Sequence, residues 1–269
     1  MRLQDRRERI LHRLLQLYVV VVFCFIFAPM AMVVLFSLNA DRFPSFPLKG
    51  FTLTWYQQLA GDTKFLHALK NSLLVASGVS FASTVLGFIG AYALHNLRFR
   101  MKNAYLALMI SPLAIPWIIL GIALLIFFHM LGIRNSLFAV WIGHMVFSAP
   151  FAMLVIRSRL IGIRRNLEEA AWDLGASRWR ALWEVVVPLA GPGLLAAALL
   201  TFTFSFAEFI IAWFLSGFEV TLPVRIWGLL STGIDPTINA IGTLVLFVSI
   251  TLVVVSELLL HSRRPRGKP

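Results

Sequence analysis

Hydrophobic residues in this chain gather into six long segments that are separated by shorter polar stretches. A helix needs about 20 apolar residues to cross the hydrocarbon core of a bilayer. The six segments that reach this length are 14–38, 71–97, 104–131, 137–156, 194–217 and 242–261. The pattern therefore predicts an all-α protein, a polytopic membrane bundle of six transmembrane helices.

The composition indicates that lipid surrounds most of the chain. Of the 269 residues, 59% are hydrophobic and 13% are charged, whereas average chains carry about 25% charged residues. So few charges cannot cover the surface of a soluble protein of this size. The first apolar segment is also too long for the core of a cleaved signal peptide, so we expect it to be retained as the first span.

The excess of basic residues is arranged in short blocks between the apolar segments. The formal net charge of +12 would by itself suit nucleic-acid binding, but the blocks at 2–13, 98–102, 157–180 and 263–268 are placed like orientation signals. The positive-inside rule then puts both termini in the cytoplasm. We expect a multi-pass membrane protein.

The segments divide the chain into four expected parts. These are a cytoplasmic N-terminal segment, the first span with a periplasmic loop, a transmembrane core and a cytoplasmic basic tail, at 1–13, 14–70, 71–261 and 262–269.

Two segments of the core carry local signals. The second contains small residues that let helix backbones approach closely; they are Gly78, Ala82, Ser83, Gly87, Gly90 and Ala91. The third contains Pro112 and Pro116, which we expect to kink the helix. The kink would either help to line a passage or be merely structural.

The segment 157–193 is the longest connection on the expected cytoplasmic side. Residues 167–174 are typical of a short helix, and Gly175 is suited to end it because glycine adopts the left-handed C-cap conformation without strain. Ser177 can cap a second helix, which we expect to run to about Val187 and to be closed by Pro188. This elbow would either insert into a groove on another protein or lie on lipid headgroups.

The spacing within the elbow resembles a motif of ABC importer permeases. Glu169-Ala170-Ala171 is followed after three residues by Gly175 and after nine more by Val185-Val186-Val187-Pro188. The family's EAA loop reads EAA, three residues, G, nine residues, I-x-L-P, so only Val185 and Val187 depart from it. Other segments resemble the second permease of the spermidine/putrescine branch of the type I, binding-protein-dependent importers; they are 51–56, 71–73, 173–177, 222–227 and 233–240.

The resemblance implies a non-catalytic, multi-pass permease subunit of a bacterial inner membrane, which forms half of the substrate pathway of an ATP-driven importer, with polyamines as substrate. It implies as partners a homologous second permease, two cytoplasmic ATPase subunits that bind ATP and Mg, and a periplasmic substrate-binding protein. No cofactor is expected in this chain. The residues expected to couple it to the ATPase are Glu169, Ala170, Ala171, Asp173, Gly175 and Pro188.

Glu208 places a carboxyl group near the middle of the fifth apolar segment, at a cost of about 2.5–3.5 kcal/mol on insertion scales. We expect it to face the bundle interior and to have a partner. It is a candidate for contact with a cationic substrate, and Phe204, Phe209 and Trp213 are candidates for lining the pathway. The alternative is a structural hydrogen bond to a neighbouring helix or to the partner permease. Polyamine-type permeases often carry a second acid directly before this position, where this chain has Ala207.

The sequence lacks the motifs of several enzyme classes. It has no glycine-rich phosphate loop and no serine nucleophile elbow, so we expect neither ATP hydrolysis nor other catalysis by the chain itself. The six histidines are scattered, and no metal site is expected. Two readings compete with a polyamine importer. One is an importer permease for another small solute, such as an aminoethylphosphonate, an opine, thiamine or ferric iron. The other is a stand-alone secondary transporter, which would leave the elbow unexplained.

Overall fold

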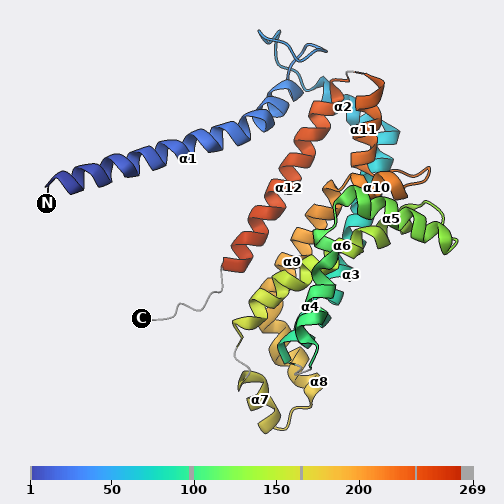
Figure 1. The fold of residues 1–269 in the computed structure, drawn as a ribbon. Coiled ribbons are helices and arrows are strands. Elements are labelled where there is room, and N and C mark those ends of the chain that lie inside the picture. The colour runs from blue at the N-terminus through green and yellow to red at the C-terminus, as the bar shows by residue number, and fades with distance from the viewer. Residues whose placement is uncertain (1, 97–99, 164–165, 234, 262–269) are drawn as a thin grey trace. The chain divides into compact units, whose positions relative to one another are not determined.

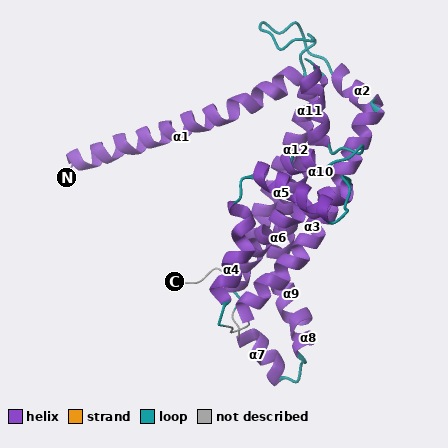
Figure 2. Cartoon of the chain, turned by 45° about the vertical axis from the view of Figure 1, so that its right-hand side comes forward, coloured by secondary structure: helices purple, strands orange, loops and turns teal. Residues whose placement is uncertain are grey.

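The computed structural model describes residues 2–96, 100–163, 166–233 and 235–261, which are almost entirely helical (Figure 1, Figure 2). The elements are α1 Arg2–Ser37, α2 Thr54–Gly61, α3 Thr63–Asn96, α4 Lys102–Ile110, the 3-10 helix η1 Ser111–Ala114, α5 Trp117–Met130, α6 Leu137–Ile161, α7 Asn166–Asp173, α8 Arg178–Ala181, the π-helix η2 Leu182–Val186, α9 Val187–Ala207, α10 Ile210–Leu215, α11 Leu222–Thr232 and α12 Thr237–His261. Within these ranges the only β-type pairing is a bridge between Asn39 and Phe51. The predicted all-α class is confirmed. The predicted basic tail, 262–269, lies outside the described residues.

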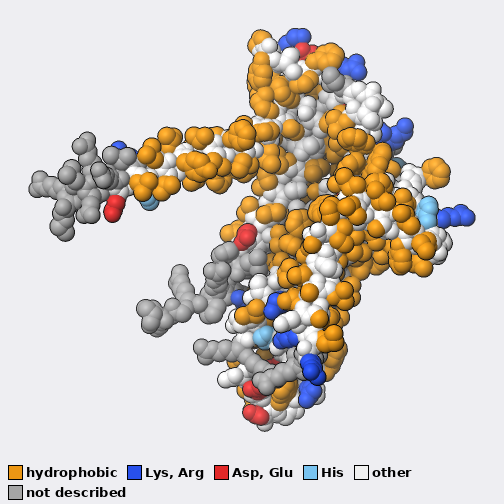
Figure 3. All heavy atoms as spheres, viewed as in Figure 1, with side chains coloured by type: hydrophobic (Ala, Val, Ile, Leu, Met, Phe, Trp, Pro, Cys, Tyr) orange, Lys and Arg blue, Asp and Glu red, His pale blue; other side chains and the backbone are white. Residues whose placement is uncertain are grey.

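The helices agree with the predicted number of spans. Over the described residues, five helices are long and apolar enough to cross a membrane, and there are six if the bent pair from α4 to α5 forms one span. Each predicted segment falls largely on one of these helices, on the bent pair, or, for the fifth segment, on α9 and α10. Hydrophobic side chains cover most of the visible face of α1, as a lipid-facing helix requires (Figure 3).

The chain divides into two compact units, which are described one at a time. The smaller consists of residues 1–62 and 229–246 and contains α1, α2 and the first part of α12. A Cβ added to Gly242 would lie 3.2 Å from the side chain of Val33, so α12 packs closely on α1.

Polar contacts hold the loop between α1 and α2. Trp55 donates a hydrogen bond from Nε1 to the carbonyl of Asn39 (2.7 Å). The ammonium of Lys49 lies 2.7 Å from Asp41, and this hydrogen bond holds the pKa of that carboxyl below its usual value. These contacts give the loop a defined path without regular secondary structure.

The larger unit, residues 63–228 and 247–269, is built on α3, α6 and α9, which pack side by side. A Cβ added to Gly87 of α3 would lie only 2.7 Å from the backbone nitrogen of Met153 in α6. The two helices therefore touch backbone to backbone at this point. The predicted small-residue packing face of the second span is confirmed.

The third span bends by 102° between α4–η1 and α5. Pro112 lies in the first turn of η1, and Pro116, with extended backbone (ψ 133°), precedes α5. Proline has no N–H and cannot continue the hydrogen-bond ladder, so the two prolines explain the break. The predicted kink is confirmed, and α5 turns to pack on α10.

The prediction that Pro188 closes the second elbow helix is wrong. The helix runs without interruption from Arg178 to Ala207, through α8, η2 and α9, and Pro188 lies in the first turn of α9. A proline ring clashes with the carbonyl four residues before it. The wider π turn, Leu182–Val186, lies directly before α9 and accommodates the ring there.

Candidate functional site

The first helix of the elbow is α7, and it ends before Gly175 as the sequence predicts. Gly175 has φ +87°, its N–H donates to the carbonyl of Trp172 (2.8 Å), and the N–H of Ala176 donates to the carbonyl of Ala171 (2.9 Å). These two bonds form a Schellman cap, which needs a residue in the left-handed conformation. The hydroxyl of Ser177 then accepts from the N–H of Arg180 (3.2 Å) and caps α8.

Most residues predicted to couple the elbow to a partner are exposed together at α7. Glu169, Ala170, Asp173 and Gly175 are exposed, and Ala171 is half-buried. They form a short exposed surface, continued by apolar side chains such as Leu174, which is 89% exposed.

The sixth predicted coupling residue, Pro188, is also exposed but belongs to the first turn of α9. The structure therefore separates it from the α7 surface by α8 and the π turn.

The inner side of α7 carries a residue that the sequence analysis did not single out. Glu168 is 5% exposed. Its carboxylate accepts hydrogen bonds from the hydroxyl of Tyr92 (2.6 Å) and from the side-chain amide of Asn96 (2.8 Å), both in the last turns of α3. The sequence held one signal for its burial. Adjacent residues of a helix point in different directions, so an exposed Glu169 indicates that Glu168 faces another way.

Glu208 lies where the fifth span breaks between α9 and α10. Its backbone is extended (ψ 128°), and its carboxylate accepts from the N–H groups of Ile211 (2.8 Å) and Ala212 (3.0 Å). The side chain therefore caps the first turn of α10, whose N–H groups have no partner within the helix.

Glu208 was expected to have a partner, and the structure shows that it is His144 of α6. Its Nε2 lies 3.0 Å from Glu208 Oε2, and both side chains are fully buried. The contact has ion-pair distance but not the alignment of a straight hydrogen bond. On the other side of the ring, Nδ1 lies 2.8 Å from the hydroxyl of Ser205. A carboxylate, an imidazole and a hydroxyl thus form one buried polar cluster.

Aromatic rings lie beside this cluster. Phe209 is 5.8 Å from Trp213 and 5.5 Å from Trp227 between ring centroids, and the two tryptophans are 6.3 Å apart. Trp213 and Trp227 are 47% and 46% exposed. Two of the predicted pathway residues, Phe209 and Trp213, are thus brought together, with Trp227 of α11 as a member that sequence spacing could not reveal.

The third aromatic candidate, Phe204, is 38% exposed. It packs edge-on against Phe151 of α6 (4.7 Å between centroids). Among the described residues, no ring contact joins Phe204 to the aromatic trio of Phe209, Trp213 and Trp227, so the aromatic candidates do not form a single cluster.

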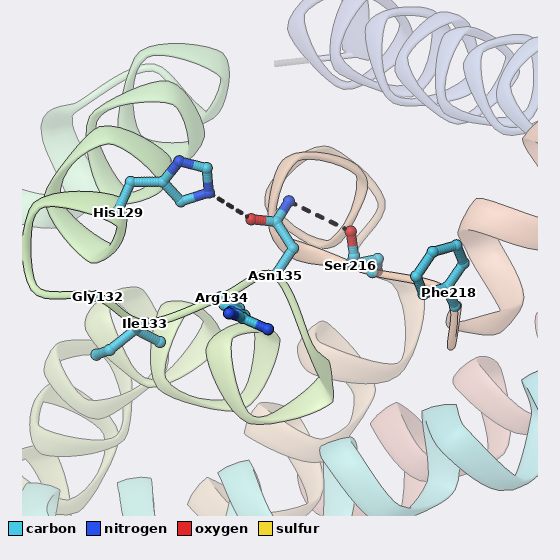
Figure 4. A pocket seen from close by; sticks show the side chains of 8 residues that line it. His129, Gly132, Ile133, Arg134, Asn135, Ser216 and Phe218 are labelled. Atoms are coloured by element: carbon cyan, nitrogen blue, oxygen red, sulfur yellow. Dashed lines mark hydrogen bonds between the residues drawn. The ribbon is translucent and has the colours of Figure 1, made fainter.

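An open hollow of about 820 Å³ lies between the α5–α6 loop and the segment after α10 (Figure 4). Asn135 organises it: its side chain contacts His129 Nε2 (2.9 Å) and donates to the carbonyls of Phe214 (2.9 Å) and Ser216 (3.4 Å). None of the predicted site residues lines it. Among the described residues, no group of three or more His, Cys, Asp or Glu side chains is arranged to hold a metal ion.

Comparison with known proteins gives consistent matches. The family model for the inner membrane component of binding-protein-dependent transport systems matches residues 83–266. The spermidine/putrescine transport system permease protein PotC of Haemophilus influenzae is 33% identical over 244 residues, 90% of this chain and 94% of that protein. The putrescine transport system permease protein PotI of Escherichia coli strain K12 is 34% identical over 232 residues, 83% of this chain and 82% of that protein.

A solved structure shares the fold. The chain from a bacterial ABC transporter involved in the import of the acidic polysaccharide alginate matches with a TM-score of 0.69 at 19% identity. The match covers 94% of this chain and 96% of that chain.

Proposed function

The chain belongs to the family of inner membrane components of binding-protein-dependent transport systems, the permeases of type I ABC importers, and on that premise we propose that it forms half of the substrate pathway of an ATP-driven importer for polyamines. The proposal is carried by sequence identity to two polyamine permeases. It is 33% over 90% of this chain for one and 34% over 83% for the other. Spermidine and putrescine are the substrates that we propose.

The elbow is the proposed contact with the ATPase. Glu169, Ala170 and Asp173 are exposed on one short helix, and Gly175 is exposed in its C-terminal cap, which suits insertion into a groove of a partner subunit. The cap at Gly175 keeps the helix end rigid, and a rigid contact is needed if closure of an ATPase pair is to move membrane helices. The chain itself has no catalytic role in this proposal, since ATP and Mg bind to the partner ATPases.

The aromatic trio supports a cationic substrate. Ammonium groups are attracted to the faces of aromatic rings, and Trp213 and Trp227 each leave nearly half of their surface accessible. Glu208 stays a predicted pathway residue. For a substrate ammonium to reach its carboxylate, it would have to displace His144, which lies at 3.0 Å.

The proposed assembly contains a homologous second permease, two cytoplasmic ATPase subunits and a periplasmic substrate-binding protein. In this arrangement both termini and the elbow face the cytoplasm. The distribution of basic residues supports this orientation, because cytoplasmic loops carry the excess of Lys and Arg.

The test is the ATPase activity of the complete complex in liposomes, with its binding protein and a panel of ligands. The panel contains spermidine, putrescine, an aminoethylphosphonate, an opine and thiamine. We expect spermidine or putrescine to stimulate hydrolysis above the level with unliganded binding protein. Stimulation by another member alone would retain the importer and reject the polyamine.

A further inference from the structure

Glu168 is a buried carboxylate at the base of an otherwise exposed helix. Its side chain is 5% exposed, whereas its neighbour Glu169 is exposed. Burying a carboxylate carries a large desolvation cost, and an apolar residue of similar size would fill the same space without it. The position of this carboxylate therefore calls for an explanation beyond packing.

Both carboxylate oxygens are used by α3. Oε1 accepts from the hydroxyl of Tyr92 at 2.6 Å, and Oε2 accepts from the amide of Asn96 at 2.8 Å. Tyr92 and Asn96 are four residues apart and so lie on one face of the helix. Hydrogen bonds to an ionised acceptor are about twice as strong as neutral ones, so this is a firm two-point attachment.

The end of α3 that receives Glu168 belongs to the packed interior of the larger unit. Leu94 of α3, Leu160 of α6 and Val186 at the end of η2, directly before α9, share one buried cluster, with Tyr92 packed against it. The polypeptide chain joins the elbow to α6 on one side and to α9 on the other. Glu168 adds a connection to α3, the third helix of this core.

We propose that Glu168 is a positioning residue that transmits movement of the elbow to α3, so that α3, α6 and α9 respond together when the elbow is displaced. This inference rests on the proposed function, because it assigns a role within coupling to an ATPase. The exposed face of α7 contacts the partner, and Glu168 on the buried face holds the elbow to the bundle.

The amide of Asn96 offers a conservative variant. Its Oδ1 is buried and has no hydrogen-bond partner among the described residues. In Glu168→Gln, rotation of the Asn96 amide would let Oδ1 accept from the new side-chain NH₂, while the Gln carbonyl accepts from Tyr92. Glu168→Gln should therefore keep the attachment in neutral form, and Glu168→Ala should abolish it.

The experiment measures spermidine transported per ATP hydrolysed by the complete complex in liposomes, after co-purification has shown that each variant assembles. Glu168→Ala should lower this ratio at least about ten-fold while ATPase activity persists, since each of the two charge-assisted hydrogen bonds that it removes corresponds to roughly that factor in an equilibrium constant. Glu168→Gln should restore most of it. Tyr92→Phe, which keeps the ring, should give an intermediate loss, and Tyr92→Phe with Glu168→Ala should be no worse than Glu168→Ala alone.

Glu184→Ala is the matched control. Glu184 pairs with Arg180 at 3.0 Å on the same elbow, but both side chains are more than half exposed, so the ratio should stay within about two-fold of the wild type. A wild-type ratio in Glu168→Ala, an equal loss of ATPase and transport, or additive effects of the Tyr92 and Glu168 changes would each overturn the inference. Failure of the proposed function looks different: the wild-type complex itself would then show no spermidine-stimulated hydrolysis.

Discussion

The carboxylate of Glu208 lies 3.0 Å from Nε2 of His144, and both side chains are fully buried. The same carboxylate accepts the N–H groups of Ile211 and Ala212 where α9 ends and α10 begins. A break in the fifth span exposes backbone groups that lipid cannot satisfy. Glu208 at the break and His144 of α6 therefore stabilise an interruption of the span that would otherwise cost free energy.

Glu208→Ala should destabilise the protein by about 3 kcal/mol, because it leaves two N–H groups without their acceptor and removes the carboxylate that lies beside the buried imidazole of His144. The measurement is thermal unfolding of the purified protein in detergent. His144→Ala should be destabilising as well, and the double variant should cost less than the sum of the two. Additive losses would show that the pair is not coupled.

Glu208→Gln separates the structural role from the predicted pathway role. Its carbonyl can still accept from the N–H groups of α10, so the unfolding temperature should fall less than in Glu208→Ala. If the carboxylate also contacts a substrate cation, polyamine transport by Glu208→Gln will fall well below what its stability explains. Normal transport would assign Glu208 to structure alone.

Local signals in the sequence were sufficient for the end of α7, for the start of α8 and for the spans. Gly175 and Ser177 set the ends of their helices through their own backbone or side chain, and apolar length alone marks a span. Pro188 was misjudged because the rule for proline assumes an α-helical turn before it. The turn at Leu182–Val186 is a π turn, so the assumption does not hold there. None of the residue types in those five positions predicts a π turn.

Long-range contacts could not be predicted in the same way. The need of Glu208 for a partner follows from its depth in the membrane, but the choice of His144 depends on how α6 packs against α9. Similarly, Glu168 and Tyr92 are 76 residues apart in sequence. Trp227 joins Phe209 and Trp213 only because the fold brings this one ring of α11 to theirs.

Gly87→Ala should destabilise the bundle by about 1–3 kcal/mol, because its Cβ would lie 2.7 Å from the backbone nitrogen of Met153 and the helices would have to separate. Thermal unfolding in detergent measures the effect. Gly191→Ala in α9 is the matched control, since its Cβ would meet open space and alanine favours the helix. Equal unfolding temperatures for the two variants would contradict backbone contact at Gly87.

Trp213→Ala should lower spermidine transport in liposomes about ten-fold if the aromatic trio contacts the substrate cation, because a desolvated cation–π contact contributes up to about 2 kcal/mol. Trp213→Phe, which keeps an aromatic face, should lose less. Phe81→Ala removes an exposed aromatic of α3 that lies outside the trio and should transport normally. Equal losses in Trp213→Phe and Trp213→Ala would argue that the ring's π face is not what the substrate contacts.

Gly175→Val should uncouple transport from ATP hydrolysis without removing the protein from the membrane. Gly175 has φ +87° with open space around it, so the cost of valine comes from backbone strain, of at least about 1–2 kcal/mol, and not from a clash. Relief of that strain would undo the Schellman cap and reshape the surface that carries Glu169 and Asp173.

The measurements are the amount of protein in membranes, ATPase activity and transport of spermidine in liposomes. Gly162→Ala is the control, because Gly162 has an ordinary φ of −79°, and it should behave as the wild type. Normal transport by Gly175→Val would show that the end of α7 need not be rigid and would remove the elbow's proposed role in coupling.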